Sequence, residues 1–203
     1  MKIICIGRNY LAHIAELDRD LPLEPLFFMK PDTALLPAGM PFPYPVFSEK
    51  VHYETELVIR ICKQGSSISL ASAHEYYDAI TVGVDFTARD VQQRCIDKGH
   101  PWEKAKSFDG SAPVGKFKKI SELNNADNIC FGMKLNGQWV QQGNSADMIF
   151  NFEKIVSYIS QYVTLKEGDC IFTGTPQGVG EVHVGDKLAL FLENEQVLEL
   201  EVR

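Results

Sequence analysis

Three acidic residues have a spacing that could bring their carboxylates to one site. Glu54 and Glu56 lie two residues apart in residues 51–62, a run that predicts a β-strand, and side chains two apart on a strand share a face. Asp85 lies near the end of a second apolar run, residues 80–86. Three carboxylates without cysteine favour a hard cation such as Mg²⁺ or Mn²⁺. An amphipathic edge strand whose acids face water is the alternative that this pattern leaves open.

Strands outnumber helices in the pattern that must position these acids. Strands are predicted at residues 2–7, 26–30, 51–62, 80–86, 129–135, 138–142, 169–173, 187–192 and 196–202. Helices are predicted at residues 70–77, 88–98 and 146–162. Because strand and helix do not alternate regularly, we expect an α+β, mainly β fold in a single domain, residues 1–203.

Composition narrows the class of protein. A net charge of −7 argues against nucleic-acid binding, which needs clustered basic residues. No apolar stretch reaches the roughly 18–20 residues of a membrane span, and the apolar run at the N-terminus is too short for a signal peptide. The five cysteines are odd in number and none forms a C-x-x-C pair, so we expect free thiols and a cytoplasmic location.

Several motifs follow one another along the chain in a fixed order. They are Gly7-Arg-Asn-Tyr-x-x-His13-x-x-Glu16, Phe28-Met-Lys30-Pro31, His52-x-Glu54-x-Glu56, Asp85-Phe-Thr-Ala-Arg89-Asp-Val-Gln92, Pro101-Trp102-x-x-Ala-Lys106 and Thr173-Gly-Thr175-Pro-Gln-Gly-Val-Gly180. In order and spacing the set resembles the fumarylacetoacetate hydrolase family, and in particular its small single-domain acylpyruvase and oxaloacetate decarboxylase branch. The resemblance implies a mixed β-roll or sandwich with a few short helices, and a homodimer.

The resemblance also implies roles for individual residues. The implied metal ligands for Mg²⁺ (or Mn²⁺) are Glu54, Glu56 and Asp85. The implied catalytic residues are His13 and Glu16, a water-activating pair, and Lys106, and the implied substrate contacts are Arg8, Lys30, Arg89, Gln92 and Thr175. The apolar sequence neighbours of Lys106 predict a lowered pKa for its ammonium group. For the glycine-rich stretch that contains Thr175, a purely structural turn is nearly as well supported as a substrate contact.

These roles predict a metal-dependent hydrolase that cleaves a C–C bond in acylpyruvate-type 2-oxo acids and also decarboxylates oxaloacetate, since both reactions leave the enolate of pyruvate. The alternatives are a fumarylpyruvate hydrolase, a 2-hydroxyhepta-2,4-dienedioate isomerase, a 2-oxopent-4-enoate hydratase, or a non-catalytic 2-oxo acid binding protein. We further expect residues 9–20 to close as a lid over the substrate. We expect Glu54→Gln or Asp85→Asn to abolish metal binding without harming the fold.

Overall fold

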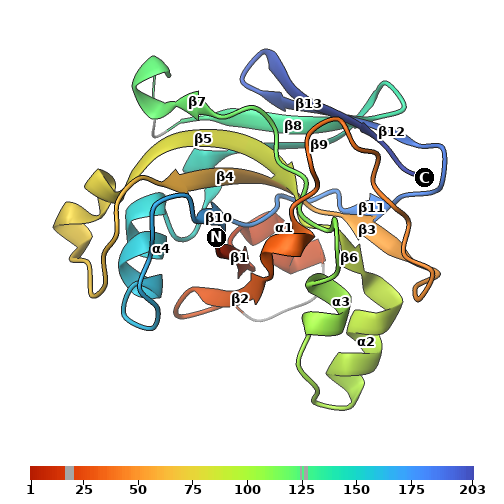
Figure 1. Ribbon diagram of the computed structural model, residues 1–203, viewed down its shortest axis with the longest axis horizontal. Helices are drawn as coiled ribbons and strands as arrows, with labels where there is room; N and C mark the ends of the chain where they lie inside the picture. The colour runs from red at the N-terminus through yellow and green to blue at the C-terminus, as the bar shows by residue number, and fades with distance from the viewer. Residues whose placement is uncertain (17–20, 124, 126–127) are drawn as a thin grey trace.

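Three β-sheets make up most of the computed structural model (Figure 1). The structure describes residues 1–16, 21–123, 125 and 128–203, apart from the side chains of residues 15 and 16. The largest sheet has six strands in the order β2-β1-β10-β4-β5-β7. Their bounds are β1 (Ile3–Gly7), β2 (Leu26–Lys30), β4 (Thr55–Ile61), β5 (Tyr77–Val84), β7 (Lys118–Lys119) and β10 (Cys170–Phe172). In this sheet β1 and β10 pair in parallel, and the other neighbouring strands pair antiparallel.

The other two sheets flank this one. A four-stranded antiparallel sheet contains β8 (Cys130–Leu135), β9 (Gln138–Asn144), β12 (Lys187–Leu192) and β13 (Glu195–Glu201). It covers β4 and β5, and the apolar side chains between the two sheets form the main core (Figure 1). A small sheet contains β3 (Val51–Tyr53), β6 (Thr87–Ala88) and β11 (Gly180–Glu181).

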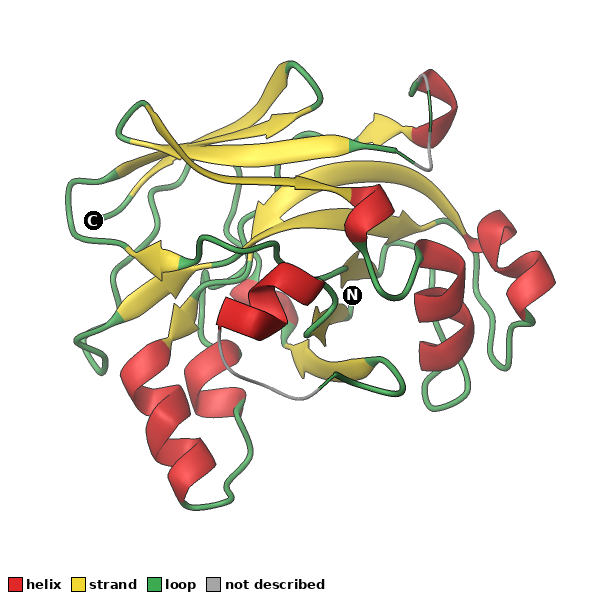
Figure 2. Ribbon diagram, turned by 180° about the vertical axis from the view of Figure 1, so that it is seen from behind, coloured by secondary structure: helices red, strands yellow, loops and turns green. Residues whose placement is uncertain are grey.

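The helices are short and lie outside the sheets. Figure 2 shows α2 and α3 side by side, and α4 at the opposite end of the large sheet. The α-helices are α1 (Leu11–Glu16), α2 (Arg89–Asp97), α3 (Glu103–Lys106) and α4 (Phe152–Ile159). The 3₁₀ helices are Asp32–Ala34, Leu70–Tyr76, Ile120–Glu122 and Ser145–Asp147. None of the described helices is long and apolar enough to cross a membrane.

Much of the predicted framework is confirmed. The fold is mainly β, and the Asn136-Gly137 turn joins β8 to β9 with positive φ angles of 50° and 83°, as a two-residue hairpin turn requires. Helix α2 lies within the predicted residues 88–98, and Gly99 follows it with a φ of 62°. All five cysteines are free thiols.

Two predicted elements were wrong, the first being the single strand over residues 51–62. The chain leaves the small sheet after β3 and enters the large sheet at β4, so Glu54 belongs to neither strand. The chain crosses in the opposite sense between β5 and β6, at Asp85 and Phe86. The Asp85 amide donates to the Glu54 carbonyl over 2.8 Å, which ties the two crossings together. Alternation along a strand cannot reveal this change of sheet.

The second error is the helix predicted over residues 146–162, of which only α4 forms as an α-helix. Asn9 hydrogen-bonds the backbone just before α4, where the predicted helix would have run. The Ile149 amide donates to the Asn9 carbonyl over 2.9 Å, and the Phe150 amide donates to Asn9 Oδ1 over 2.8 Å. The helix therefore begins after Asn151, whose side chain caps the Lys154 amide over 3.0 Å.

Candidate active site

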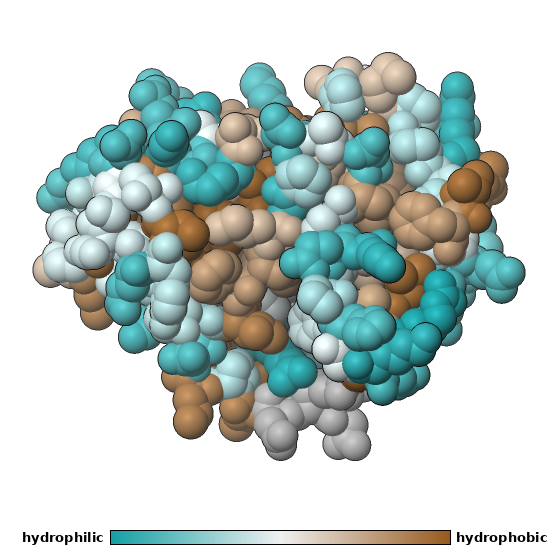
Figure 3. All heavy atoms as spheres, turned by 60° about the horizontal axis from the view of Figure 1, so that its bottom comes forward, coloured by the Kyte–Doolittle hydropathy of each residue, from teal (hydrophilic) through white to brown (hydrophobic). Residues whose placement is uncertain are grey.

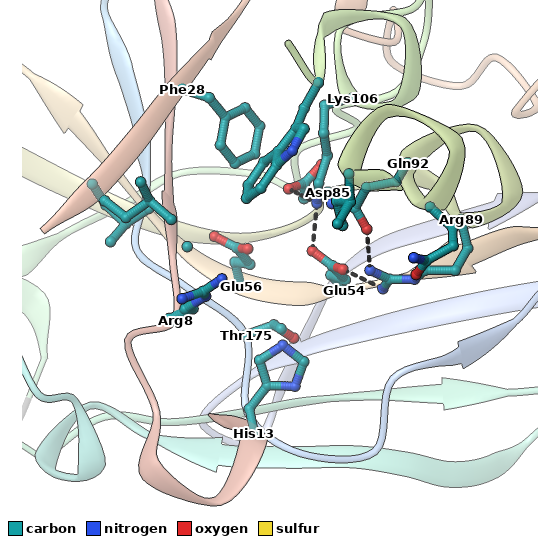
Figure 4. A pocket seen from close by; sticks show the side chains of 16 residues that line it. Arg8, His13, Phe28, Glu54, Glu56, Asp85, Arg89, Gln92, Lys106 and Thr175 are labelled. Atoms are coloured by element: carbon teal, nitrogen blue, oxygen red, sulfur yellow. Dashed lines mark hydrogen bonds and ion pairs between the residues drawn. The ribbon is translucent and has the colours of Figure 1, made fainter. Parts of the chain in front are cut away.

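A cavity of about 210 Å³ lies at the junction of the large and small sheets. Strand β1 and helices α1, α2 and α3 contribute its walls (Figure 4). Of the residues predicted to form the site, nine line this cavity: Arg8, His13, Glu54, Glu56, Asp85, Arg89, Gln92, Lys106 and Thr175. The cavity also has an apolar wall that includes Phe28 and Trp102, for which the sequence predicts no substrate contact.

Three carboxylates gather in this cavity. One oxygen from each of Glu54, Glu56 and Asp85 lies within 4.8 Å of the others, and all three side chains are buried. Burial, and next the charges of Asp85 and Glu54, raise the pKa of the Glu56 carboxyl well above its usual range. A divalent ion would relieve this repulsion, and an all-oxygen donor set suits Mg²⁺ or Mn²⁺. The residues present therefore fit such an ion.

Lys106 bridges two of the carboxylates from the end of α3. Its Nζ lies 2.7 Å from Glu54 Oε2 and 2.7 Å from Asp85 Oδ2. Burial lowers the pKa of Lys106, but the charges of Asp85 and Glu54 outweigh it and raise the pKa to about 12. The lowered pKa expected from apolar sequence neighbours is thus wrong, because those neighbours do not include the two acids.

Helix α2 supports Glu54 from the other side. Arg89 Nη2 forms an ion pair with Glu54 Oε1, and Arg89 Nη1 donates to Gln92 Oε1 over 2.6 Å. Lys106 and Arg89 outweigh the effect of burial on Glu54, so the pKa of this carboxyl is held below its usual range. These pairs alter the expected effect of substitution, since Glu54→Gln removes a partner from two cations and does not simply relieve repulsion.

Lys30 lies beneath Asp85 and is not among the residues that line the cavity. Its buried Nζ is 2.7 Å from Asp85 Oδ1 and donates to Ser111 Oγ over 2.9 Å. The substrate contact implied for Lys30 by the family resemblance stays a prediction. Because Asp85 holds two buried lysines, Asp85→Asn would also cost stability.

The glycine-rich loop after β10 closes another side of the cavity. The Gly174 amide donates to Glu56 Oε2 over 2.7 Å. Gly174 has a φ of 102°, and an added Cβ would lie 2.7 Å from the Asn9 Cβ, so only glycine fits. Next to it, Thr175 Oγ1 accepts a hydrogen bond from Gln141 Nε2 over 2.9 Å. Gln141 is a supporting residue that no sequence motif indicated.

Helix α1 places His13 in the cavity wall, where the side chain is buried (Figure 4). Asn9, just before the helix, fixes this segment through hydrogen bonds from its Nδ2 to the carbonyls of Phe150 and Thr173. The side chain of Glu16 lies outside the described residues. The lid closure expected for residues 9–20 stays a prediction, because residues 17–20 also lie outside them.

Comparison with known proteins identifies the family. The family model for the fumarylacetoacetate (FAA) hydrolase C-terminal domain matches residues 2–203. The chain is 41% identical over 186 residues to the mitochondrial oxaloacetate tautomerase FAHD1 of Bos taurus, covering 92% of this chain and 84% of that protein. It is 42% identical over 188 residues to the mitochondrial oxaloacetate decarboxylase of Dictyostelium discoideum, covering 91% and 85%.

A solved structure is also similar to this chain. The fumarylpyruvate hydrolase of Pseudomonas aeruginosa, in complex with Mn²⁺ and pyruvate, superposes with a TM-score of 0.93 at 36% identity, covering all of this chain and 89% of that one. With a buried acidic cluster at the sheet junction and a family match over nearly its whole length, the chain belongs to the fumarylacetoacetate hydrolase family.

Proposed function

We propose that this chain is a divalent-metal-dependent enzyme that interconverts the enol and keto forms of oxaloacetate. The observation that carries the proposal is the convergence of three buried carboxylates and Lys106 in a small cavity. The sequence motifs alone favour hydrolysis of acylpyruvates. The relatives whose names specify oxaloacetate tautomerases reverse that preference.

The cavity residues suit a proton transfer on a 2-oxo acid. A divalent ion held by Glu54, Glu56 and Asp85 would polarise the ketone and stabilise the negative charge of an enolate. From enol to ketone, one proton is added at C3 and one leaves the enol oxygen, and no water enters. Lys106, charged at neutral pH, lies beside the cluster, where it could donate the first proton and take up the second. Phe28 and Trp102 would keep bulk water away from this exchange.

Cleavage of a C–C bond in acylpyruvates is the second candidate, with decarboxylation of oxaloacetate beside it. The observation in its favour is His13, buried in the cavity wall on α1, where it could take a proton from an attacking water. The solved fumarylpyruvate hydrolase with Mn²⁺ and pyruvate supports a 2-oxo acid in a site of this kind. Both candidates pass through an enolate, so one site could serve both.

A substrate panel tests the proposal. Chelator-treated protein would be assayed with Mg²⁺, Mn²⁺ or no metal for loss of the enol of oxaloacetate, release of CO₂ and cleavage of acetylpyruvate and fumarylpyruvate. We expect metal-dependent loss of the enol to be the fastest reaction. Faster cleavage of an acylpyruvate would favour the second candidate, and full activity after exhaustive chelation would refute the metal role. Binding of 2-oxo acids without turnover would favour a binding protein.

The homodimer and the cytoplasmic location expected from the sequence remain proposals. Leu21, Leu23 and Leu26, before and at the start of β2, expose apolar side chains that an association could bury. Figure 3 shows apolar patches among polar ones on the face that forms the bottom of Figure 1, where β2 lies.

A further inference from the structure

The cations that line the cavity differ in their partners. Lys106 pairs with Glu54 and Asp85, and Arg89 pairs with Glu54. Arg8 also lines the cavity, but within the described part of the chain its side chain has neither an ion pair nor a hydrogen bond. Arg8 is a half-buried residue, and a guanidinium in the cavity lining without an anion carries charge that a ligand could neutralise.

The backbone holds Arg8 in this place at some cost. Arg8 follows β1 directly and has a φ of 58°, in the left-handed region that residues other than glycine seldom adopt. Such conformations persist when the surroundings impose them, and they cluster at functional sites. Here the neighbouring Asn9 is tied to the Phe150 and Thr173 carbonyls, which fixes the chain immediately after Arg8.

Arg8 and Gln92 lie on opposite sides of the carboxylate cluster in Figure 4. A 2-oxo acid has one carboxylate next to its ketone, and these two groups are the ones that a metal at the cluster would bind. If that end lies on the Gln92 side of the cluster, the other end of the acid extends toward Arg8. A guanidinium pairs with a carboxylate through two parallel hydrogen bonds, a geometry that a neutral group cannot offer.

We propose that Arg8 is a specificity-determining residue that binds the second carboxylate of a dicarboxylic 2-oxo acid. This inference rests on the proposed function, because it presumes that a 2-oxo acid occupies the cavity. It selects short dicarboxylates such as oxaloacetate over acylpyruvates that end in a neutral group. The cavity of about 210 Å³ agrees with a short acid, being smaller than the ~300–1,000 Å³ of pockets for drug-sized ligands.

The test compares oxaloacetate with its 4-methyl ester, which has the same carbon skeleton without the second charge. Steady-state ketonisation and calorimetric binding with Mg²⁺ would be measured for both ligands on the wild type, Arg8→Gln and Arg8→Lys. Arg8→Asn is added because asparagine tolerates a left-handed backbone. Arg94→Gln is the matched control. Arg94 is largely exposed on α2, so this substitution removes the same charge at a position outside the cavity.

We expect Arg8→Gln to weaken oxaloacetate binding and kcat/KM by about 10- to 100-fold, mostly through KM, the usual effect of losing a charged hydrogen-bond partner. Binding of the ester should change less than about threefold, and Arg8→Lys should fall between. Equal losses on both ligands, or no loss on oxaloacetate, would overturn the inference. If the wild type turns over neither ligand but Arg8→Gln still abolishes the preference for oxaloacetate, the proposed function fails and the role of Arg8 stands.

Discussion

Glu56→Gln should stabilise the metal-free protein while it removes metal binding. Glu56 is buried beside Asp85 and Glu54, and within the described part of the chain it has no ion pair with a lysine or arginine. Two unit charges 4.8 Å apart repel each other by about 3 kcal/mol at an effective dielectric of ~20. The neutral glutamine avoids two such repulsions. It also loses the attraction to Lys106 and accepts a weaker hydrogen bond from the Gly174 amide. The net gain in the free energy of unfolding is about 2 kcal/mol.

Glu54→Gln is the matched control, with the same chemical change two residues away. Glu54 neutralises both Lys106 and Arg89. Removing one member of a buried pair costs about 3–5 kcal/mol, and the lower end applies because Lys106 keeps Asp85. Both variants should lose Mg²⁺ binding, but their effects on the stability of the metal-free protein should have opposite signs.

Urea denaturation of chelator-treated protein between pH 5 and 8 would measure both effects, with calorimetry for Mg²⁺ binding. The raised pKa of Glu56 means that the native state binds a proton more tightly than the unfolded state, so wild-type stability should fall as pH rises above the ordinary value of 4.5. Glu56→Gln should remove that decline, and its advantage should grow with pH. If the two variants shift the free energy of unfolding in the same direction, the charge assignment in this cluster is wrong.

Two further predictions concern the α1 segment. His13→Ala should slow acylpyruvate cleavage on the order of 10²–10⁴-fold, because His13 is proposed to take a proton from the attacking water. Mg²⁺ affinity and ketonisation should change little, since His13 is not proposed as a metal ligand. An unchanged cleavage rate would show that another group activates the water. Asn9→Ala should lower the free energy of unfolding by about 3–5 kcal/mol, since it leaves buried partners at Phe150 and Thr173 unsatisfied. As a control, Asn151→Ala at the exposed helix cap should lower it by only about 1 kcal/mol. Equal losses would show that the hydrogen bonds of Asn9 to Phe150 and Thr173 do not contribute as proposed.

The parts of the fold that could be predicted are those with a local cause. Apolar runs identified strands such as Ile3–Gly7 and Leu26–Lys30, and Asn-Gly identified the hairpin at Asn136. The three acids were grouped correctly although the reasoning about them was partly wrong. Glu54 and Glu56 do not share one strand, but the crossings at Glu54 and Asp85 bring their carboxylates together at the same junction.

The parts that could not be predicted depend on contacts between distant segments. The start of α4 depends on Asn9, which lies 141 positions from Phe150. The pKa of Lys106 depends on Glu54 and Asp85, which lie 52 and 21 positions away. A pattern of neighbours in sequence contains neither distance, so local reasoning gave the wrong helix start and the wrong direction for the pKa shift.

Lys30 shows the limit of motif reasoning most clearly. Its motif belongs to the family and its residue lies close to the site, yet its ammonium group contacts Asp85 Oδ1 from a position outside the cavity lining. Lys106 contacts Asp85 Oδ2 from within the cavity. The same residue type therefore contacts the same carboxylate from two different places: Lys30 pairs with the buried acid from outside the cavity lining, and Lys106 pairs with it from the cavity wall. Spacing in a motif predicts proximity to a site, but only the direction of the side chain separates support from chemistry.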